Sequence, residues 1–204
     1  SFKGKGCVIE SMKNMLFIMN PKAGRTTLKN SLVDVLEVFC NNDYAVRTYL
    51  TKSADDAERI VQEEGANYDV IVCAGGDGTL GNTVTGYMKS GIRVPLGYIP
   101  CGSTNDFARS MDIPRETVEA AEMIVKAEPF SIDIGSLNDK NFVYVAAFGM
   151  FSDTSYATPQ NMKNIFGHAA YVLQGIKSLA NVPSYKMKVT IDGDEQEGEF
   201  IFGM

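Results

Sequence analysis

The chain has 204 residues, of which 45% are hydrophobic and 22% charged, which is the composition of a soluble globular protein with one large domain or slightly more. Its net charge of -6 argues against a nucleic-acid-binding protein, because such proteins usually carry a basic surplus. Four cysteines without a Cys-x-x-Cys pair, together with a single histidine, argue against a His/Cys zinc site.

The placement of the cysteines in the sequence also indicates the cellular compartment of the protein. Cys40 and Cys73 occupy apolar stretches, so we expect both to be small buried side chains. A reducing cytoplasm is the simplest environment for such thiols. No secretory signal is visible, and no apolar run approaches the ~20 residues that a membrane-spanning helix needs. We therefore expect a cytoplasmic protein without a transmembrane segment, which meets any membrane from its surface.

The N-terminal part of the chain alternates short apolar runs with amphipathic segments. Strands are predicted over residues 15–19, 44–50, 70–73 and 94–99. Helices are predicted over residues 28–39, 51–64, 79–89 and 116–126. In the second helix, Ser53 is expected to act as the N-cap ahead of Asp55 and Asp56. This alternation is typical of a Rossmann-like α/β domain with a parallel sheet, which we assign to residues 1–130.

The pattern changes after Pro129. Strands are predicted over residues 131–137, 141–148, 186–191 and 198–202, with one helix over residues 165–179. Consecutive strands with short connections indicate hairpins, so residues 131–204 are predicted to form a mainly β domain. Because the chain stops on an apolar strand, we expect the sheet to continue beyond residue 204 and this domain to be incomplete.

Polar loops follow three strands of the predicted parallel sheet, over residues 20–25, 75–82 and 102–109. Ligands of open α/β sheets bind beyond the carboxyl ends of the strands, so the loops are expected to face one crevice. Their glycines allow backbone amides to approach an anion, and the helix beginning near Gly78 points its positive end there. Phosphate binding is the natural hypothesis. A single Gly-Gly-Asp-Gly is as often only a tight turn, so the convergence of three loops is the stronger argument.

Two common nucleotide motifs are absent. The chain contains no Gly-x-x-x-x-Gly-Lys-Ser/Thr loop, which excludes a P-loop enzyme, and no Gly-x-Gly-x-x-Gly, which argues against an ordinary dinucleotide fold. The motifs that are present, "NPKAG" at 20–24, "GGDGT" at 75–79 and "GSTNDFAR" at 102–109, resemble the diacylglycerol kinase catalytic-domain family, especially its soluble bacterial lipid kinases. Thr51 and Asp133 match in position as well. The GGDGT motif is shared with NAD kinases and phosphofructokinases, whereas Gly-x-x-Asn-Asp-Phe-Ala-Arg is much more discriminating.

The resemblance implies an ATP site between a nucleotide domain and a β-sandwich domain. The residues that it places at the nucleotide are Asn20, Pro21, Lys22, Ala23, Gly24, Thr51, Gly75, Gly76, Asp77, Gly78, Thr79, Asn82, Gly102, Ser103 and Asn105. The family usually has threonine at position 103, and Ser103 keeps the hydroxyl. It commonly has Leu-Asn-Glu where this chain has Leu80-Gly81-Asn82, which weakens any role carried over to Asn82.

Three carboxylates also follow or end strands at the proposed binding edge. The resemblance implies that Asp77, Asp106 and Asp133 form a network around Mg²⁺, a cation that prefers oxygen ligands and makes carboxylates tolerable beside phosphates. Without the resemblance, Asp106 is equally well explained as a helix cap and Asp133 as a hydrogen-bonded residue at a strand end.

The resemblance further implies the reaction, in which the γ-phosphoryl group of ATP passes to the hydroxyl of diacylglycerol or a related lipid at the membrane surface. It places the catalytic base in an Asp-Gly-Glu-type motif near the family's C-terminus. Asp192-Gly193-Asp194 is similar, but its surroundings are those of a surface turn. We therefore expect the base to lie outside this chain and the chain alone to be inactive. An NAD kinase-like enzyme and a catalytically dead nucleotide- or lipid-binding module are the alternatives, and a homodimer is an open expectation.

Overall fold

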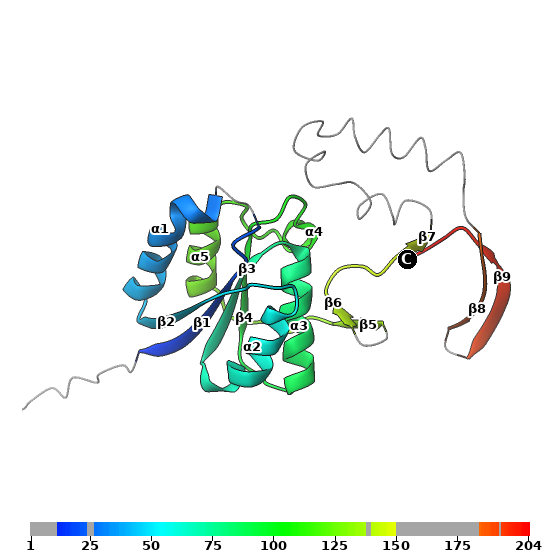
Figure 1. Cartoon of the computed structure of the whole chain (residues 1–204), viewed down its shortest axis with the longest axis horizontal. Helices are drawn as coiled ribbons and strands as arrows, with labels where there is room; N and C mark the ends of the chain where they lie inside the picture. The colour runs from blue at the N-terminus through cyan, green and yellow to red at the C-terminus, as the bar shows by residue number, and fades with distance from the viewer. Residues whose placement is uncertain (1–11, 24–26, 138–139, 150–183, 192) are drawn as a thin grey trace, which may run out of the picture. The chain divides into compact units, whose positions relative to one another are not determined.

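The computed structural model describes residues 12–23, 27–137, 140–149, 184–191 and 193–204 (Figure 1). These residues belong to two compact units, of which the first ends at Tyr144 and the second begins at Val145. Residues 131–144, which the sequence assigns to the second domain, thus belong to the first unit. The helix predicted over residues 165–179 lies outside the described residues. No helix in the described ranges combines the length and apolarity needed to cross a membrane.

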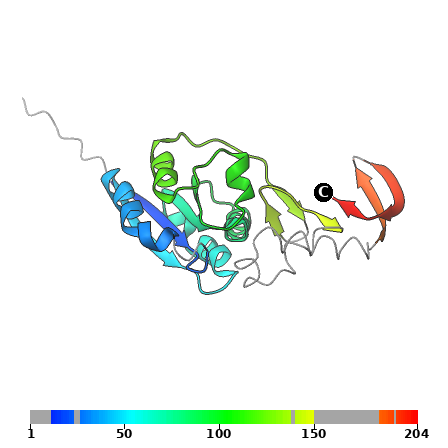
Figure 2. The ribbon, with the colours of Figure 1, turned by 90° about the horizontal axis from the view of Figure 1, so that it is seen from above.

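The first unit is built on a sheet of four parallel strands in the order β2-β1-β3-β4. The strands are β1 (Lys13–Met19), β2 (Tyr44–Leu50), β3 (Val70–Gly75) and β4 (Leu96–Pro100). The helices are α1 (Thr27–Asn41), α2 (Asp56–Glu64), the 3-10 helix η1 (Gly65–Asn67), α3 (Asp77–Ser90), α4 (Asp106–Ser110) and α5 (Thr117–Lys126). Figures 1 and 2 show α1 and α5 on one face of the sheet and α2 and α3 on the other. The predicted α/β class with a parallel sheet is confirmed.

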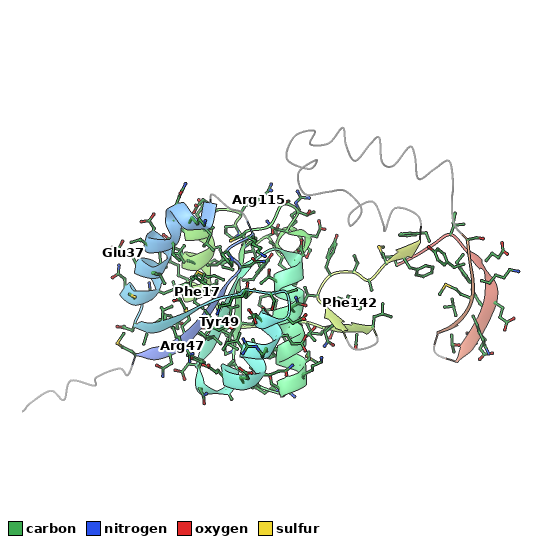
Figure 3. The ribbon with its side chains drawn as sticks, in the orientation of Figure 1. Phe17, Glu37, Arg47, Tyr49, Arg115 and Phe142 are labelled. Carbon is green, nitrogen blue, oxygen red and sulfur yellow. The ribbon has the colours of Figure 1, made fainter. Side chains whose placement is uncertain are left out.

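The two central strands send alternate side chains to opposite faces, because successive residues of a strand point in opposite directions. Phe17 packs with the residues of α1 and α5 (Figure 3). Its ring meets that of Phe39 edge to face, with 5.6 Å between the ring centroids. Its neighbours Leu16 and Ile18 pack against α2 on the other face. Both faces of the sheet are therefore covered, which explains why the two central strands are apolar runs.

Helix α2 begins later than predicted. Ser53 is not its N-cap, because the helix starts at Asp56 and the residue before it, Asp55, makes no side-chain capping bond. The carboxylate of Asp56 instead accepts hydrogen bonds from the amides of Lys52 and Ser53. The segment from Thr51 to Asp55 is thus a loop held by the first residue of the helix rather than the first turn itself.

A short antiparallel pair extends the first unit beyond the sheet. It consists of β5 (Gly135–Leu137) and β6 (Lys140–Phe142), so the predicted hairpin is confirmed although its first strand begins later than residue 131. The pair lies against α3, where the amide of Asn141 donates to the buried hydroxyl of Thr85 at 3.2 Å. Helix α3 therefore links the strand-end loop at its start to the β5–β6 pair.

The second unit contains the remaining described strands. These are β7 (Phe148–Gly149), β8 (Tyr185–Ile191), β9 (Asp194–Phe200) and β10 (Phe202–Gly203). β8 pairs antiparallel with β9, and β7 pairs antiparallel with β10. The turn between β8 and β9 contains Gly193 at φ +95°, and Asp194 beside it is exposed. The expectation of small antiparallel sheets after the α/β region is confirmed, and Gly193 and Asp194 lie at a hairpin turn as predicted.

The cysteines give a direct test of the core. Burial raises the pKa of the Cys73 and Cys101 thiols to about 12, and both side chains are inaccessible to solvent or nearly so. The prediction of a buried Cys40 is wrong: Phe39 takes the inward position on α1, and the next residue points away and is exposed.

At pH 8 we expect iodoacetamide to label Cys40 while Cys73 and Cys101 stay unmodified, measured by peptide mass spectrometry. Labelling of all three cysteines at equal rates in the native protein would contradict this core.

Candidate active site

The carboxyl ends of the four parallel strands form one edge of the sheet. Beyond the strands, the amide of Thr51 donates to β1 at 2.9 Å and the amide of Asn20 donates to β3 at 3.0 Å. The amide of Cys101 likewise donates to β3, at 2.7 Å. Because the sheet ladder continues into these first loop residues, the loops begin from fixed positions at one edge, as the sequence predicts.

Two of the loops touch through their glycines. A Cβ atom added to Gly102 would lie 2.6 Å from the Cα of Gly76, and one added to Gly76 would lie 3.2 Å from the Cα of Gly102. The first distance is shorter than real Cβ atoms show and the second is tighter than most of their contacts, so the loops after β3 and β4 pack backbone to backbone. Gly78, the second residue of α3, makes no such close contact, because its Cβ position has nothing within 4 Å. The amide-rich start of α3 thus lies beside open space, which fits the approach of a phosphate.

The first loop is tied to the second by a side-chain hydrogen bond. The amide group of Asn20 donates to the hydroxyl of Thr79 at 2.9 Å, and its carbonyl oxygen accepts from the amide of Lys22 at 2.9 Å. Thr79 is buried, whereas Pro21 and Lys22 are exposed and Ala23 is half-buried. Gly24 lies outside the described residues. The structure therefore brings the loops after β1 and β3 together.

Asn105 shapes the loop after β4. It has a left-handed conformation with φ 53° and is almost fully buried. Its side chain accepts from the amide of Gly102 at 2.8 Å and donates to the carbonyl of Gly102 at 2.9 Å. Since both ends of the amide are used within the loop, Asn105 holds Gly102 in place, while Ser103 beside it is exposed.

Tyr98 supports the same junction and was not predicted from the sequence. Its hydroxyl donates to the carbonyl of Gly75 at 3.1 Å and lies 3.4 Å from Asn105 Oδ1. Burial raises the pKa of Tyr98, with the negative charge of Asp77 adding to the effect, so the hydroxyl remains a donor. The only available signal was a tyrosine in an otherwise apolar strand just before the Gly-Ser-Thr-Asn loop.

The three predicted cation ligands, Asp77, Asp106 and Asp133, have different surroundings in the structure. Asp77 is the first residue of α3, and its carboxylate accepts from the amide of Phe107 at 3.4 Å, next to Asp106. Asp133 is exposed in the segment that precedes β5. Among the described residues no three Asp, Glu, Cys or His side chains are close enough to hold a metal ion. The donor set fits Mg²⁺ held by one or two carboxylates together with substrate phosphates, which is its usual mode; the three-aspartate network stays a prediction.

Asn82 makes a contact within the protein. Its side-chain amide donates to the carbonyl of Ala54 at 2.7 Å, which ties α3 to the loop between β2 and α2. Gly81 before it faces β6, since its Cβ position lies 3.9 Å from the carbonyl oxygen of Asn141. The Leu-Gly-Asn departure therefore falls on a stretch of α3 that packs against two neighbouring segments.

Comparisons with known proteins agree with this geometry. The diacylglycerol kinase catalytic domain, as a family, matches residues 14–137. A diacylglycerol kinase of Staphylococcus aureus (strain JH9) is 35% identical over 191 residues, which are 92% of this chain and 60% of that protein. The crystal structure of a diacylglycerol kinase from Bacillus anthracis (strain Sterne) is 27% identical with a TM-score of 0.74, over 93% of this chain and 62% of that one.

A second Bacillus anthracis crystal structure is 29% identical with a TM-score of 0.79, over 98% of this chain and 66% of its own. The chain thus spans about three fifths of the curated relatives that it matches (60%). Since the family match covers the parallel sheet from residue 14 onward and each of the three strand-end loops, the chain belongs to the diacylglycerol kinase catalytic-domain family.

Proposed function

We propose that the protein is an ATP-dependent lipid kinase, which transfers the γ-phosphoryl group of ATP to the hydroxyl of diacylglycerol or a related lipid. The observation that carries the proposal is the convergence of the loops after β1, β3 and β4 at one sheet edge. There, Gly76 packs against Gly102, and the Cβ position of Gly78 at the start of α3 has nothing within 4 Å. The family membership supports phosphoryl transfer to a lipid acceptor.

In this proposal the protein binds and orients the nucleotide. The amides at the start of α3 would face the phosphates, because the first-turn amides of a helix have no partner within it and its dipole favours negative charge there. Asn20 and Asn105 hold the loops through their side-chain hydrogen bonds to Thr79 and Gly102. Thr51 and Ser103 follow β2 and β4 at the same sheet edge and are the further residues that would contact the nucleotide.

Two carboxylates at this edge would hold the cation. Mg²⁺ would neutralise the charge that the transferred phosphoryl group carries. Asp77 and Asp106 are the first residues of α3 and α4, whose starts are joined by the bond from the Phe107 amide to Asp77, and they are the residues that would bind it, with Asp133 as a third member of the proposed network. The proposal also includes a cytoplasmic location, peripheral attachment to the membrane surface where the lipid lies, and a homodimer to be tested by light scattering.

The test is a phosphorylation assay of the full-length gene product with radiolabelled ATP and Mg²⁺. The acceptors are diacylglycerol, a sphingoid base, ceramide and NAD, each offered in mixed micelles or in solution. We expect label in a lipid product, with diacylglycerol the best acceptor. Label in NAD alone would replace the lipid assignment with that of an NAD kinase-like enzyme. No labelled product with any acceptor would indicate a catalytically dead binding module.

A further inference from the structure

The loop between β2 and α2, residues 51–55, carries one of the proposed nucleotide contacts. Thr51 is buried, with 7% of its surface exposed, and its amide is bonded to β1. Lys52, Ser53, Ala54 and Asp55 are all exposed, and the loop contains no regular hydrogen-bond ladder of its own. Its shape must therefore come from contacts with its surroundings.

The carboxylate of Asp56 provides one such contact. Its Oδ2 accepts from the amide of Lys52 at 2.7 Å and from the amide of Ser53 at 3.1 Å. The bond from the Lys52 amide contributes most to lowering the pKa of Asp56 to about 2, and the interaction with Arg59 and the bond from the Ser53 amide add to it. The side chain is 13% exposed, so it faces the loop rather than solvent.

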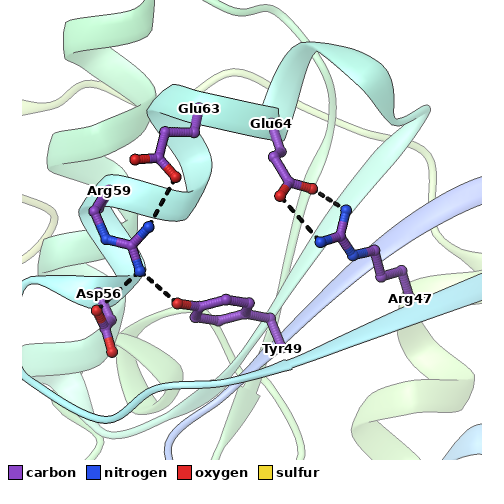
Figure 4. Close-up of polar contacts among 6 residues, drawn as sticks. All are labelled: Arg47, Tyr49, Asp56, Arg59, Glu63 and Glu64. Carbon is purple, nitrogen blue, oxygen red and sulfur yellow. Dashed lines mark hydrogen bonds and ion pairs between the residues drawn. The ribbon is translucent and has the colours of Figure 1, made fainter.

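Asp56 is itself held in place by a network that spans β2 and α2 (Figure 4). Arg59 Nη2 donates to Asp56 Oδ1 at 3.2 Å and to the Tyr49 hydroxyl at 2.6 Å, while Nη1 donates to Glu63 at 2.8 Å. Tyr49 comes from the strand that leads into the loop. Strand, loop and helix are therefore joined through one carboxylate and one guanidinium.

The loop is also held by a residue of α3. The side-chain amide of Asn82 donates to the carbonyl of Ala54 at 2.7 Å. Asn82 lies about one turn beyond Thr79 on the helix whose start faces the proposed phosphate position. A shift of the loop would therefore move both Thr51 and the helix that carries Asp77 to Thr79.

We propose that Asp56 is a positioning residue of the nucleotide site: its carboxylate, braced by Arg59, fixes the loop 51–55 and with it Thr51 and the start of α3. The inference rests on the proposed function, since it takes the ligand to be a nucleotide. It differs from a purely local role at the start of a helix, which would change the stability of α2 and leave nucleotide affinity unchanged.

The test compares variants of the full-length gene product. Asp56→Ala removes the oxygen that accepts both loop hydrogen bonds, and Asp56→Asn keeps one oxygen acceptor without the charge. We expect Asp56→Ala to raise the Kd for Mg–ATP and the KM for ATP about tenfold, because a tenfold change in an equilibrium constant corresponds to the net free energy of about one hydrogen bond. The kcat should change far less. Asp56→Asn should fall between Asp56→Ala and the unchanged protein. Hydrogen exchange of the Lys52 and Ser53 amides should follow the same order.

The matched control is Asp55→Ala, because Asp55 is the neighbouring acid and its side chain makes no capping bond. A second control is Glu64→Gln, which weakens the ion pair between Glu64 of α2 and Arg47 of β2 and leaves the contacts of the loop unchanged (Figure 4). Both controls should bind Mg–ATP as the unchanged protein does. Urea unfolding separates affinity from stability, and affinities are compared where every variant is folded.

The outcomes distinguish the two proposals. If the unchanged protein binds Mg–ATP and folded Asp56→Ala binds it equally well, the positioning role is wrong while the proposed function stands. If Asp55→Ala or Glu64→Gln weakens binding as much as Asp56→Ala, the effect is one of general stability and the positioning role is again wrong. If the unchanged protein binds no nucleotide, the proposed function fails and the positioning role fails with it.

Discussion

Asp77→Asn is expected to lower lipid phosphorylation by the full-length gene product by about 10²-fold or more, the usual scale for losing one group that stabilises developing charge. The reason is electrostatic. Asparagine keeps an oxygen that can accept from the amide of Phe107, a bond of 3.4 Å, so the junction between α3 and α4 is retained. It removes the negative charge that a divalent cation requires beside the phosphates.

The measurement is kcat/KM for ATP at several Mg²⁺ concentrations, together with the urea midpoint of each protein. The control is Asp112→Asn, which removes an exposed carboxylate just after α4, at φ 52°, a conformation that asparagine tolerates. We expect the control to retain full activity, and the unfolding midpoint of Asp77→Asn to stay close to that of the unchanged protein. Retention of activity and of magnesium dependence in Asp77→Asn would show that Asp77 is not a cation ligand.

Gly78→Ala is expected to separate nucleotide binding from stability. The Cβ position of Gly78 has nothing within 4 Å, so the added methyl group meets no protein atom, and alanine in a helix is favoured over glycine by up to about 1 kcal/mol. The same methyl group would occupy the space that the phosphates need. We expect an unfolding free energy that is unchanged or higher, with a Kd for Mg–ATP raised at least about tenfold by the misplaced ligand.

Gly81→Ala is the matched control for this change. It lies on the same helix, and its Cβ position meets only the carbonyl oxygen of Asn141, at an ordinary 3.9 Å. It should gain the same helix stability and keep the nucleotide affinity of the unchanged protein, measured by titration calorimetry. Equal affinities for Gly78→Ala and Gly81→Ala would mean that the phosphates do not lie at the start of α3.

The sequence predicts the α/β unit well because its central strands, β1 and β3, are buried on both faces. Uninterrupted apolar runs such as 70–73 appear only where helices cover the sheet on either side, and β3 is fully buried, as such a run requires. The helix α1 was recognisable from its apolar spacing, although that spacing did not separate Phe39 from the neighbouring Cys40. A position one residue along turns by 100° around the helix, so an apolar stretch alone cannot say which of two adjacent side chains is buried.

The site was less predictable, because its key bonds join residues far apart in the sequence. The loops could be placed at one sheet edge from strand direction alone, but the contact between Gly76 and Gly102 depends on three-dimensional packing. Asn105 was predicted as a ligand contact, and the structure shows its side chain bonded within its own loop. The start of α2 at Asp56 could not be predicted, because the Asp56 carboxylate accepts from the amides of Lys52 and Ser53 and holds them in a loop, and only the fold shows these bonds.

The most direct test of the account is hydrogen exchange of the full-length gene product with and without saturating Mg–ATP, followed by mass spectrometry. The account predicts slower exchange in the peptides that cover residues 75–82 and 102–109, because their amides face the phosphates or hold the loop that does. Peptides of β8 and β9 serve as the internal reference and should exchange at the same rate in both samples. Unchanged exchange at both loops, under conditions where calorimetry shows nucleotide bound, would contradict the claim that this sheet edge is the nucleotide site.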